Sequence, residues 1–325
     1  MARRSHRPAF TLIELLVTSA IVAMLLGVLL PAVQKQRGNA AREACVNNLR
    51  QMGSAAQNHT DAKNGQFPHN TTINNDPSNE SAYPGFTAAG IHITGGMSGP
   101  YYGWSVLMLP YLEQDKVYKL FDMTRNWNAT EQNLKAASAE SMKVFQCPSG
   151  PHFGRTIDNV LDGKTYKVTA SDYTAFGSAY YNSIYRSPTT YFACAMQNML
   201  GHPTSLNDVT DGTSNTVLIV EQTDRPYEWK AGKLTGTQPG IGQWGSWPNF
   251  HYNFRTYTFD GSTANGECAI NCNNSGTIYS FHPDGANVVM CDGSVRFLKQ
   301  SGVGQSLVVA LLSIQGGEVL ADNDF

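Results

Sequence analysis

Charged side chains are scarce in this sequence. Asp, Glu, Lys and Arg make up only 15% of its 325 residues, and they leave a net charge of −2. A chain so close to neutral gives no electrostatic reason to expect a partner rich in phosphate. We therefore expect no nucleic acid among its partners.

The short motifs of common enzymes are also missing. The sequence contains no P-loop, no H-E-x-x-H zinc motif and no G-x-S-x-G nucleophile elbow. Residues 240–245 spell G-x-G-x-x-G, but they follow Gln238-Pro239 instead of a strand, which excludes a dinucleotide site. With no catalytic constellation visible, we expect a protein that is not an enzyme.

Cysteine is sparse for a chain of this length. With 41% hydrophobic residues, the chain can build a core without a framework of disulfides. If the C-terminal part lies outside the cytoplasm, some cysteines can pair, and Cys268 with Cys272 is the first pair to expect because the two are close in a loop-like stretch. The sequence does not determine the remaining pairs. The six cysteines are Cys45, Cys147, Cys194, Cys268, Cys272 and Cys291.

One long apolar run lies near the start of the chain, from Phe10 to Val33. As a helix with a rise of about 1.5 Å per residue, this run would be ~36 Å long, enough to cross a hydrocarbon core of about 30 Å. Residues 1–9 carry three arginines and no acid, and such a basic leader favours the cytoplasmic side. Lys35 and Arg37 on the far side reduce this asymmetry. The run is predicted to lie in a membrane or in the core of a filament.

Glu14 interrupts the apolar run close to its start. An acid inside a membrane helix costs roughly 2.5–3.5 kcal/mol, and less near the interface. Glu14 could therefore lie in the headgroup region without a further role, or it could pair with a positive group of another subunit. The residues around it favour the second interpretation.

The segment Phe10-Thr-Leu-Ile-Glu14-Leu-Leu-Val resembles the class III signal of type IV pilins and pseudopilins. A short basic leader, a Phe at the expected first mature position and a Glu four residues later carry the resemblance. It implies that a prepilin peptidase cuts between Ala9 and Phe10 and methylates the new amino terminus. It also implies that Glu14 neutralises the Phe10 amino group of a neighbouring subunit. Leaders of that family nearly always end in Gly, whereas this one ends in Ala9.

Two other export signals fit less well. A secretory signal peptide has a shorter apolar core without a Glu inside it, and it ends at an A-x-A site that this sequence does not show. The pair Arg3-Arg4 suggests a twin-arginine signal, but the residues after it do not fit that signal.

The helix is predicted to continue beyond the membrane. Residues 34–62 place apolar and small side chains at helical spacing, which is typical of an amphipathic helix that packs on a globular domain. From Phe10 to about Asp61 the helix would be ~78 Å long. The predicted stripe consists of Ala41, Cys45, Asn48 or Leu49, Met52, Ala55 or Ala56, and His59.

Residues 63–325 are predicted to form a globular domain rich in turns and short strands, because Gly, Asn, Ser and Thr are abundant there. Residues 63–99 are expected to form a long loop. Short helices are expected from Trp104 and over 131–142, and a buried strand over 216–221. Residues 144–149 are expected to be extended and then to turn at Pro148.

A hairpin is predicted over 286–299. Two apolar segments are joined there by Asp292-Gly293, and Asp-Gly between apolar strands is a strong signal for a type I′ turn. His282 lies just before this hairpin. At about 3.4 Å per residue, His282 and Asp292 would be ~20 Å apart, too far for a catalytic pair. We therefore expect Asp292 and Gly293 to form the turn and His282 to hydrogen-bond a neighbouring loop.

Several motifs together resemble a large family of planctomycete proteins, the domain of unknown function 1559, whose members join a pilin-type N-terminus to a C-terminal H-x9-DG motif. His282 and Asp292-Gly293 match that motif with nine residues between them. The resemblance implies an α+β, pilin-like fold with a long N-terminal helix packed on an antiparallel β-sheet, and no established activity. The other matching motifs are Trp104 with Leu109-Pro110-Tyr111 and Glu113-Gln114, Cys147-Pro148-Ser149, Ser171-Asp172-Tyr173, and residues 211–216.

Oxygen-bearing side chains cluster between residues 207 and 215, and Asp208 and Asp211 are weak candidates for a calcium site. Their spacing does not match an EF-hand, and a capping box from Ser205 to Asp208 explains the cluster without an ion. We therefore expect no cofactor, with calcium as the alternative.

Two classes of function remain open. The first is a structural subunit, pilin-like or pseudopilin, that is processed before Phe10 and assembles with copies of itself or with similar subunits through its N-terminal helix. The second is a membrane-anchored envelope protein that binds a ligand, with a glycan as the candidate, through the aromatic stretch from Trp229 to Tyr257. Both place the helix in the inner membrane and the globular domain outside the cytoplasm, and assembly into a filament would carry the subunit outside the cell. The sequence does not distinguish a long filament, a short pseudopilus and a monomeric anchor.

Overall fold

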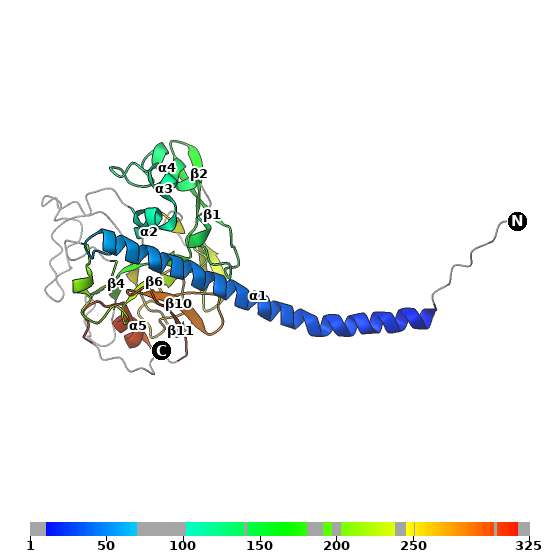
Figure 1. Ribbon diagram of the computed structural model, residues 1–325. Helices are drawn as coiled ribbons and strands as arrows, with labels where there is room; N and C mark the ends of the chain where they lie inside the picture. Colours follow the sequence, from blue (N-terminus) through cyan, green and yellow to red (C-terminus); the bar gives the residue numbers. More distant parts are fainter. Residues whose placement is uncertain are drawn as a thin grey trace.

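A long helix projects from a globular body of mixed helices and strands (Figure 1). The structure is a computed structural model that describes residues 11–69, 102–139, 142–180, 191–196, 203–237, 245–249, 251–301 and 304–317. The α+β fold and the long N-terminal helix expected from the sequence are both present. Most of the predicted 63–99 loop lies outside the described residues.

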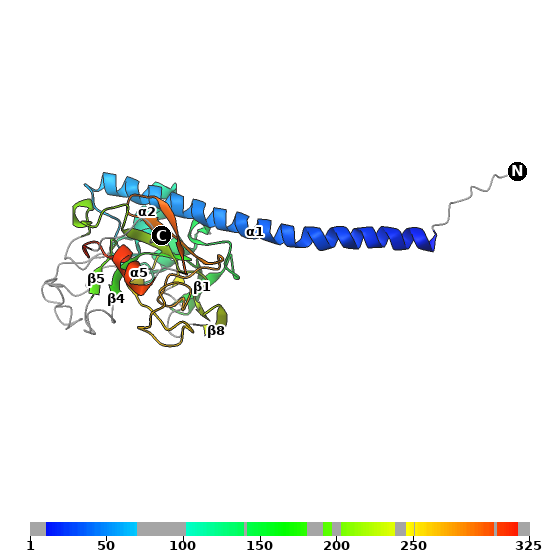
Figure 2. The same cartoon turned by 90° about the horizontal axis from the view of Figure 1, so that it is seen from below.

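Helix α1 runs from Leu12 to Ala62, 51 residues without interruption. It begins with a capping box in which the Thr11 side chain accepts from the Glu14 backbone N–H and the Glu14 carboxylate accepts from that of Thr11. Figures 1 and 2 show that its first half stands clear of the body, while its second half lies along it. The helix predicted from Phe10 to about Asp61 is thus confirmed over its described length.

The two halves of α1 differ in burial as well as in position. The 19 residues Leu12–Leu30 are apolar enough to cross a membrane, and none of this stretch is buried. Further along, Cys45, Leu49 and Met52 are completely buried. The predicted apolar stripe is therefore the face that packs on the body.

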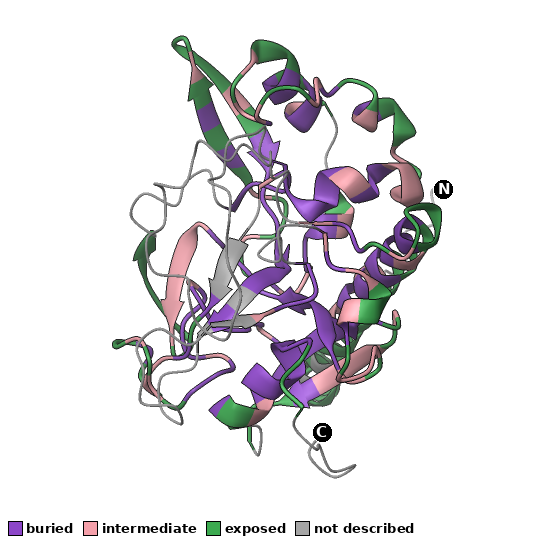
Figure 3. Ribbon diagram, turned by 90° about the vertical axis from the view of Figure 1, so that its left-hand side faces the viewer, coloured by how far each residue is buried: buried purple, intermediate pink, exposed green. Residues whose placement is uncertain are grey.

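The helix packs on a central four-stranded sheet in the order β11-β10-β6-β3, with every neighbouring pair antiparallel. Its members are β3 (Tyr173–Thr174), β6 (Val217–Glu221), β10 (Gly285–Met290) and β11 (Val295–Lys299). All residues of β6 and β10 are buried, and Figure 3 shows this buried layer in the middle of the body.

Both faces of this sheet are covered. On β10, Val289 belongs to the hydrophobic cluster that contains the α1 residues, whereas Val288 and Met290 belong to the cluster of α5 (Gln305–Leu312). Successive side chains of a strand point to opposite faces, so α1 and α5 cover opposite sides. Burial on both faces explains why residues 217–220 of β6 and 288–290 of β10 are apolar at successive positions instead of alternating with polar residues.

Further strands surround the central sheet. A three-stranded sheet contains β5 (Tyr191–Ala193), β4 (Phe176–Tyr180) and β9 (His251–Phe254), and β4 pairs with β9 in parallel. Two hairpins are formed by β1 (Thr156–Leu161) with β2 (Lys164–Thr169), and by β7 (Tyr227–Lys230) with β8 (Lys233–Thr237). The sheets are thus antiparallel, as expected, except at the β4–β9 pair.

Short helices cover the other end of the body. They are α2 (Trp104–Met108), α3 (Asp115–Tyr118) and α4 (Glu131–Ser138), with 3-10 turns η2 (Leu109–Leu112), η3 (Lys143–Phe145) and η4 (Leu206–Asp208). The helix predicted over 131–142 ends early, at Ser138, and η3 replaces part of the extended segment predicted from Val144. The capping box predicted from Ser205 to Asp208 is confirmed, with both of its hydrogen bonds.

The hairpin of β10 and β11 is confirmed, but the prediction of a type I′ turn is wrong. That turn needs positive φ at two successive residues, and here Gly293 has a φ of 82° while Asp292 does not have a positive φ. The Met290 N–H donates to the Ser294 carbonyl and the Gly293 N–H to the Met290 carbonyl. Three residues therefore form the loop, and the glycine takes the left-handed position that closes it.

This turn touches α1 at a point where two glycines meet. A Cβ added to Gly53 would lie 2.9 Å from the Gly293 carbonyl oxygen and 3.1 Å from Cγ1 of Val289. A Cβ added to Gly293 would lie 3.3 Å from Cγ of Gln57. The helix and the hairpin can approach this closely because neither position has a side chain.

A large side chain at Gly53 should separate the helix from the hairpin. We predict that Gly53→Leu destabilises the protein by about 1–3 kcal/mol, the usual cost of inserting atoms into a packed core. Gly38→Leu is the matched control, since nothing lies within 4 Å of the Cβ position of Gly38 on the same helix. Denaturant unfolding of the detergent-solubilised chain measures both variants. Equal stability of the two would contradict the close contact.

Candidate functional site

The residues predicted to act in processing and assembly lie at the free end of α1. Ala9 and Phe10 are outside the described residues. Glu14 lies in the exposed first turn, where its carboxylate accepts hydrogen bonds from the Thr11 backbone N–H at 2.9 Å and from the Thr11 hydroxyl at 2.8 Å. Within a single chain, Glu14 therefore caps its own helix.

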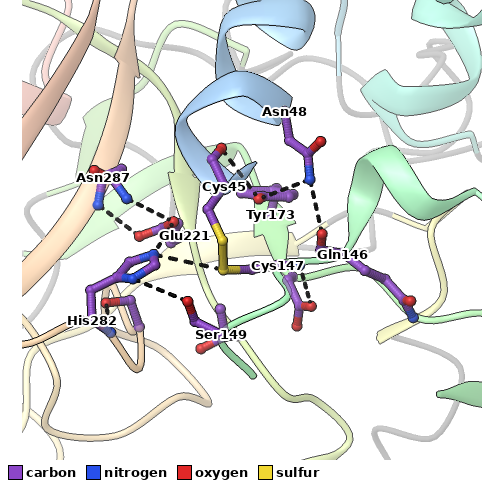
Figure 4. The surroundings of a disulfide bond; sticks show 12 residues. Cys45, Asn48, Gln146, Cys147, Ser149, Tyr173, Glu221, His282 and Asn287 are labelled. Carbon is purple, nitrogen blue, oxygen red and sulfur yellow. Dashed lines mark hydrogen bonds and ion pairs between the residues drawn. A yellow bond between two sulfur atoms is a disulfide. The ribbon is translucent and has the colours of Figure 1, made fainter. Parts of the chain in front are cut away.

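The other predicted motif residues surround the place where α1 meets the body. We use the term helix junction for the contacts of Cys45, Gly53 and Gln57 on α1 with residues 147–149, Glu221 and residues 282–293. Figure 4 shows its centre, a disulfide that joins α1 to the segment after η3. The helix junction is the candidate functional site of the body.

The disulfide joins Cys45 and Cys147, which are 102 positions apart in the sequence. On the chain-entropy estimate, closing a loop of about this length disfavours the unfolded state by roughly 4.7 kcal/mol. The sequence did not predict this pair. The predicted pair, Cys268 with Cys272, is confirmed.

His282 lies against this disulfide in the interior. Its Nε2 is 3.0 Å from Oε1 of Glu221 and 3.7 Å from Sγ of Cys147, while its Nδ1 is 3.3 Å from the Ser149 hydroxyl (Figure 4). The expected bond to a neighbouring loop exists, through Ser149. The contact with Glu221, at the end of strand β6, was not foreseen.

The Glu221 carboxylate is fully buried and receives several hydrogen bonds. Asn287 donates to it twice, from the backbone N–H at 2.7 Å and from the side-chain amide at 3.1 Å. His282 supplies the remaining contact, and both side chains of this pair are at most 1% exposed. A carboxylate is stable in such a place only with partners of this kind.

A second buried carboxylate, Asp172, fixes the other side of the disulfide. Its Oδ2 accepts from the Cys147 backbone N–H at 2.8 Å, and its Oδ1 accepts from the Asp224 backbone N–H at 2.7 Å and from the Arg155 guanidinium. Tyr173, the last residue of the Ser-Asp-Tyr motif, also lies at the helix junction, where its hydroxyl is 3.5 Å from the Cys45 carbonyl oxygen. Burial, with Glu221 nearby, raises the pKa of the Tyr173 phenol well above its usual range.

The turn formed by Asp292 and Gly293 contacts α1 at Gly53. This point is slightly more than two helical turns along α1 from Cys45 of the disulfide. The Asp292 carboxylate accepts from the backbone N–H and the hydroxyl of Ser294, at 2.9 and 2.6 Å, and so stabilises the turn. Gln57 of α1 donates to the Cys291 carbonyl. His282 and Asp292 have different partners, as the sequence argument against a catalytic pair requires, but both ends of the H-x9-DG segment support the same helix.

The predicted calcium candidates already have backbone partners. The Asp208 carboxylate accepts from the backbone N–H and hydroxyl of Ser205, at 2.7 and 2.8 Å. The Asp211 carboxylate accepts from the backbone N–H groups of Gly316 and Gly317, at 2.6 and 2.9 Å. Asp208 therefore caps η4, and Asp211 holds the segment after α5, while a calcium ion at these residues stays a prediction.

The aromatic stretch suggested as a ligand surface is partly core. Trp247 and Phe254 are buried, at 1% and 0% exposure, and the indole N–H of the half-buried Trp229 donates to Asp224 at 2.8 Å. Trp244 and Phe250 lie outside the described residues. The described part of this stretch therefore stabilises the body more than it offers a surface.

Comparison with known protein families gives two matches. The family described as "Protein of unknown function (DUF1559)" matches residues 34–302, and the "Prokaryotic N-terminal methylation motif" matches residues 4–30. No curated protein and no solved structure matches the chain. The first match covers the packed half of α1 and the body up to the end of the β10–β11 hairpin, and the second covers most of the leader and the free half of α1.

The buried pair of His282 and Glu221 generates a stability prediction. Removing one partner leaves a charge or a donor unpaired in the interior, so His282→Phe and Glu221→Leu should each cost about 3–5 kcal/mol. The double variant should lose clearly less stability than the sum of the two single losses, because neither residue is then left without its partner. Denaturant unfolding gives the three values.

An exposed ion pair provides the control for this cycle. Lys167 and Asp158 are 2.9 Å apart with side chains that are 68% and 56% exposed, so Lys167→Ala should change stability by less than about 1 kcal/mol. Additive losses at His282 and Glu221 would show that the two residues do not act as a pair.

Proposed function

We propose that this chain, which belongs to the DUF1559 family of proteins of unknown function and carries a prokaryotic N-terminal methylation motif, is a type IV pilin-like or pseudopilin structural subunit. A prepilin peptidase processes it before Phe10, and it assembles with copies of itself or with similar subunits through the first half of α1. The methylation motif supports this processing and assembly, and the DUF1559 match adds no specific activity.

One observation carries the proposal: the free half of α1 is an apolar rod on which none of the described residues packs. Within Leu12–Leu30, its large apolar side chains are between about half and three-quarters exposed, from 53% for Val17 to 76% for Met24. Apolar surface on this scale requires either lipid or other apolar helices around it. A pilin-like subunit meets both conditions in turn, first in the membrane and then in an assembly.

Glu14 supplies specificity for this assembly in our proposal. Among the residues that the structure describes, its carboxylate hydrogen-bonds Thr11, the residue next to the proposed new terminus. After cleavage, the amino group of Phe10 in a neighbouring subunit offers a positive charge to the same carboxylate. A charge pair formed in apolar surroundings has a defined geometry and penalises other registers.

The orientation of the chain across the membrane follows from the charge of its leader and from the oxidised state of its cysteines. The basic leader favours the cytoplasmic side, which places the body beyond the inner membrane. The disulfides Cys45–Cys147 and Cys268–Cys272 support this side, since disulfides persist in oxidising compartments.

Processing is tested by the mass of the mature chain. In a host with a prepilin peptidase, we expect a chain that begins with methylated Phe10, and Ala9→Gly should raise the processed fraction because family leaders end in glycine. Mass spectrometry of the N-terminal peptide measures both. An uncleaved Met1, or a cut beyond Val33, would refute the proposal.

Assembly is tested by separating the two roles of Glu14. We predict that Glu14→Ala is processed normally but forms few crosslinked oligomers in the membrane, whereas Glu14→Asp, which keeps the charge, retains part of them. Thr11→Ala is the matched control, since it removes the helix cap and leaves the acid. If Thr11→Ala and Glu14→Ala reduce oligomers equally, capping and not intersubunit pairing is the role of Glu14.

A further inference from the structure

Four potential metal ligands meet at the centre of the helix junction. They are the two sulfurs of the Cys45–Cys147 disulfide, the Glu221 carboxylate and the His282 imidazole, and their ligand atoms all lie within 4.8 Å of one another. All four residues are buried. Figure 4 shows these side chains converging from α1, the segment after η3, strand β6 and the loop before β10.

We propose that this cluster binds a zinc ion whenever the disulfide is reduced, in a closed site of two cysteine thiolates, one histidine and one glutamate. Zinc and the disulfide are then alternative ways of fixing α1 to the body at the same point. Every chain is synthesised with its cysteines as thiols, so a dithiol form of the chain exists before the disulfide does. The proposal concerns the body and is independent of the function proposed for the free half of α1.

The geometry is close to what tetrahedral zinc requires. With Zn–S bonds of about 2.3 Å and Zn–N or Zn–O bonds of about 2.0–2.2 Å, neighbouring ligand atoms lie roughly 3.3–3.8 Å apart. The distance from Cys147 Sγ to His282 Nε2 is 3.7 Å, and that from His282 Nε2 to Glu221 Oε1 is 3.0 Å. The two sulfurs must move apart, which reduction of their bond allows, and the other ligand atoms, all within 4.8 Å of one another, must come closer wherever they exceed this spacing.

The surroundings would orient these ligands. With its proton on Nδ1, His282 donates to the Ser149 hydroxyl, 3.3 Å away, and turns the lone pair of Nε2 toward the sulfurs. Asn287 holds the Glu221 carboxylate by two hydrogen bonds, and the Cys147 backbone N–H is fixed by Asp172. Partners of this kind fix tautomers and raise metal affinity.

The exchange between the two forms conserves electrons and protons. A dithiol reductant supplies two electrons and two protons, so that the disulfide becomes two thiols and the reductant becomes its own disulfide. Zinc then binds as the two thiols release their protons to solvent. The proton shared by His282 Nε2 and Glu221 in the disulfide form moves to His282 Nδ1, which faces Ser149, and this frees Nε2 and the carboxylate for the metal. Oxidation of the two thiolates by a disulfide oxidant reverses these steps and releases the metal.

Cobalt spectroscopy on the full chain in detergent provides the test. The background is Cys268→Ser/Cys272→Ser, which removes the other disulfide and leaves the helix junction intact. After reduction, Co²⁺ should bind one per chain, with the ligand-field bands of a tetrahedral site and a thiolate-to-cobalt charge-transfer band. The oxidised chain should show neither. Zn²⁺ should displace the cobalt.

Conservative ligand variants identify the site. His282→Gln and Glu221→Gln should each weaken zinc binding by about tenfold or more, as the loss of a metal-supporting group does. Asp158→Asn is the matched control, because it neutralises an exposed carboxylate outside the helix junction and should bind zinc like the background. Unchanged affinity in both ligand variants, or cobalt binding by the oxidised chain, would overturn the proposal.

If the ligand variants fail to fold, X-ray absorption on the reduced, zinc-loaded background protein identifies the atoms bound to zinc. The proposal requires two sulfur and two nitrogen or oxygen neighbours around each zinc ion. A shell of four sulfurs, of nitrogen and oxygen alone, or the absence of stoichiometric zinc would contradict it.

Discussion

The packing of the second half of α1 on the β10–β11 hairpin determines how the rest of this protein is arranged. It rests on the glycine contact at Gly53 and Gly293, which lets helix and turn approach closely, and on the disulfide of Cys45, which fixes the helix less than three turns away. Because α1 is one uninterrupted helix, a contact made in its second half also sets the direction of the first half. The apolar segment thus leaves the body as a rod with a defined orientation (Figure 1).

The H-x9-DG segment gains a physical meaning from this arrangement. Its histidine lies beside the disulfide and the buried Glu221. Its Asp-Gly turn contacts Gly53 and Gln57 of α1. One end thus lies against the disulfide that joins α1 to the body, and the other end contacts α1 directly. In this chain the segment therefore contributes to the place where the N-terminal helix joins the body.

Local patterns in the sequence predicted the local features, and contacts between distant segments had to come from the structure. The long helix and the β10–β11 hairpin follow from periodicity, whereas the turn type was wrong because Asp-Gly is compatible with more than one hairpin loop. Asp162-Gly163, with φ values of 49° and 75°, does form the two-residue loop between β1 and β2, and the same signal could have revealed that hairpin. The Cys45–Cys147 bond and the role of Glu221 depend on residues brought together across 102 and 61 positions, which no local pattern encodes.

If the helix junction makes helix and body one unit, the packed half of α1 should unfold only when the central sheet does. Native-state hydrogen exchange of the full, oxidised chain in detergent, followed at increasing denaturant, measures this directly. The account predicts that amides of residues 49–56 on α1 open with the same free energy as those of β6 and β10. Exchange of the α1 amides at a clearly lower free energy, with the sheet still protected, would show that the helix detaches from a folded body and would contradict the account.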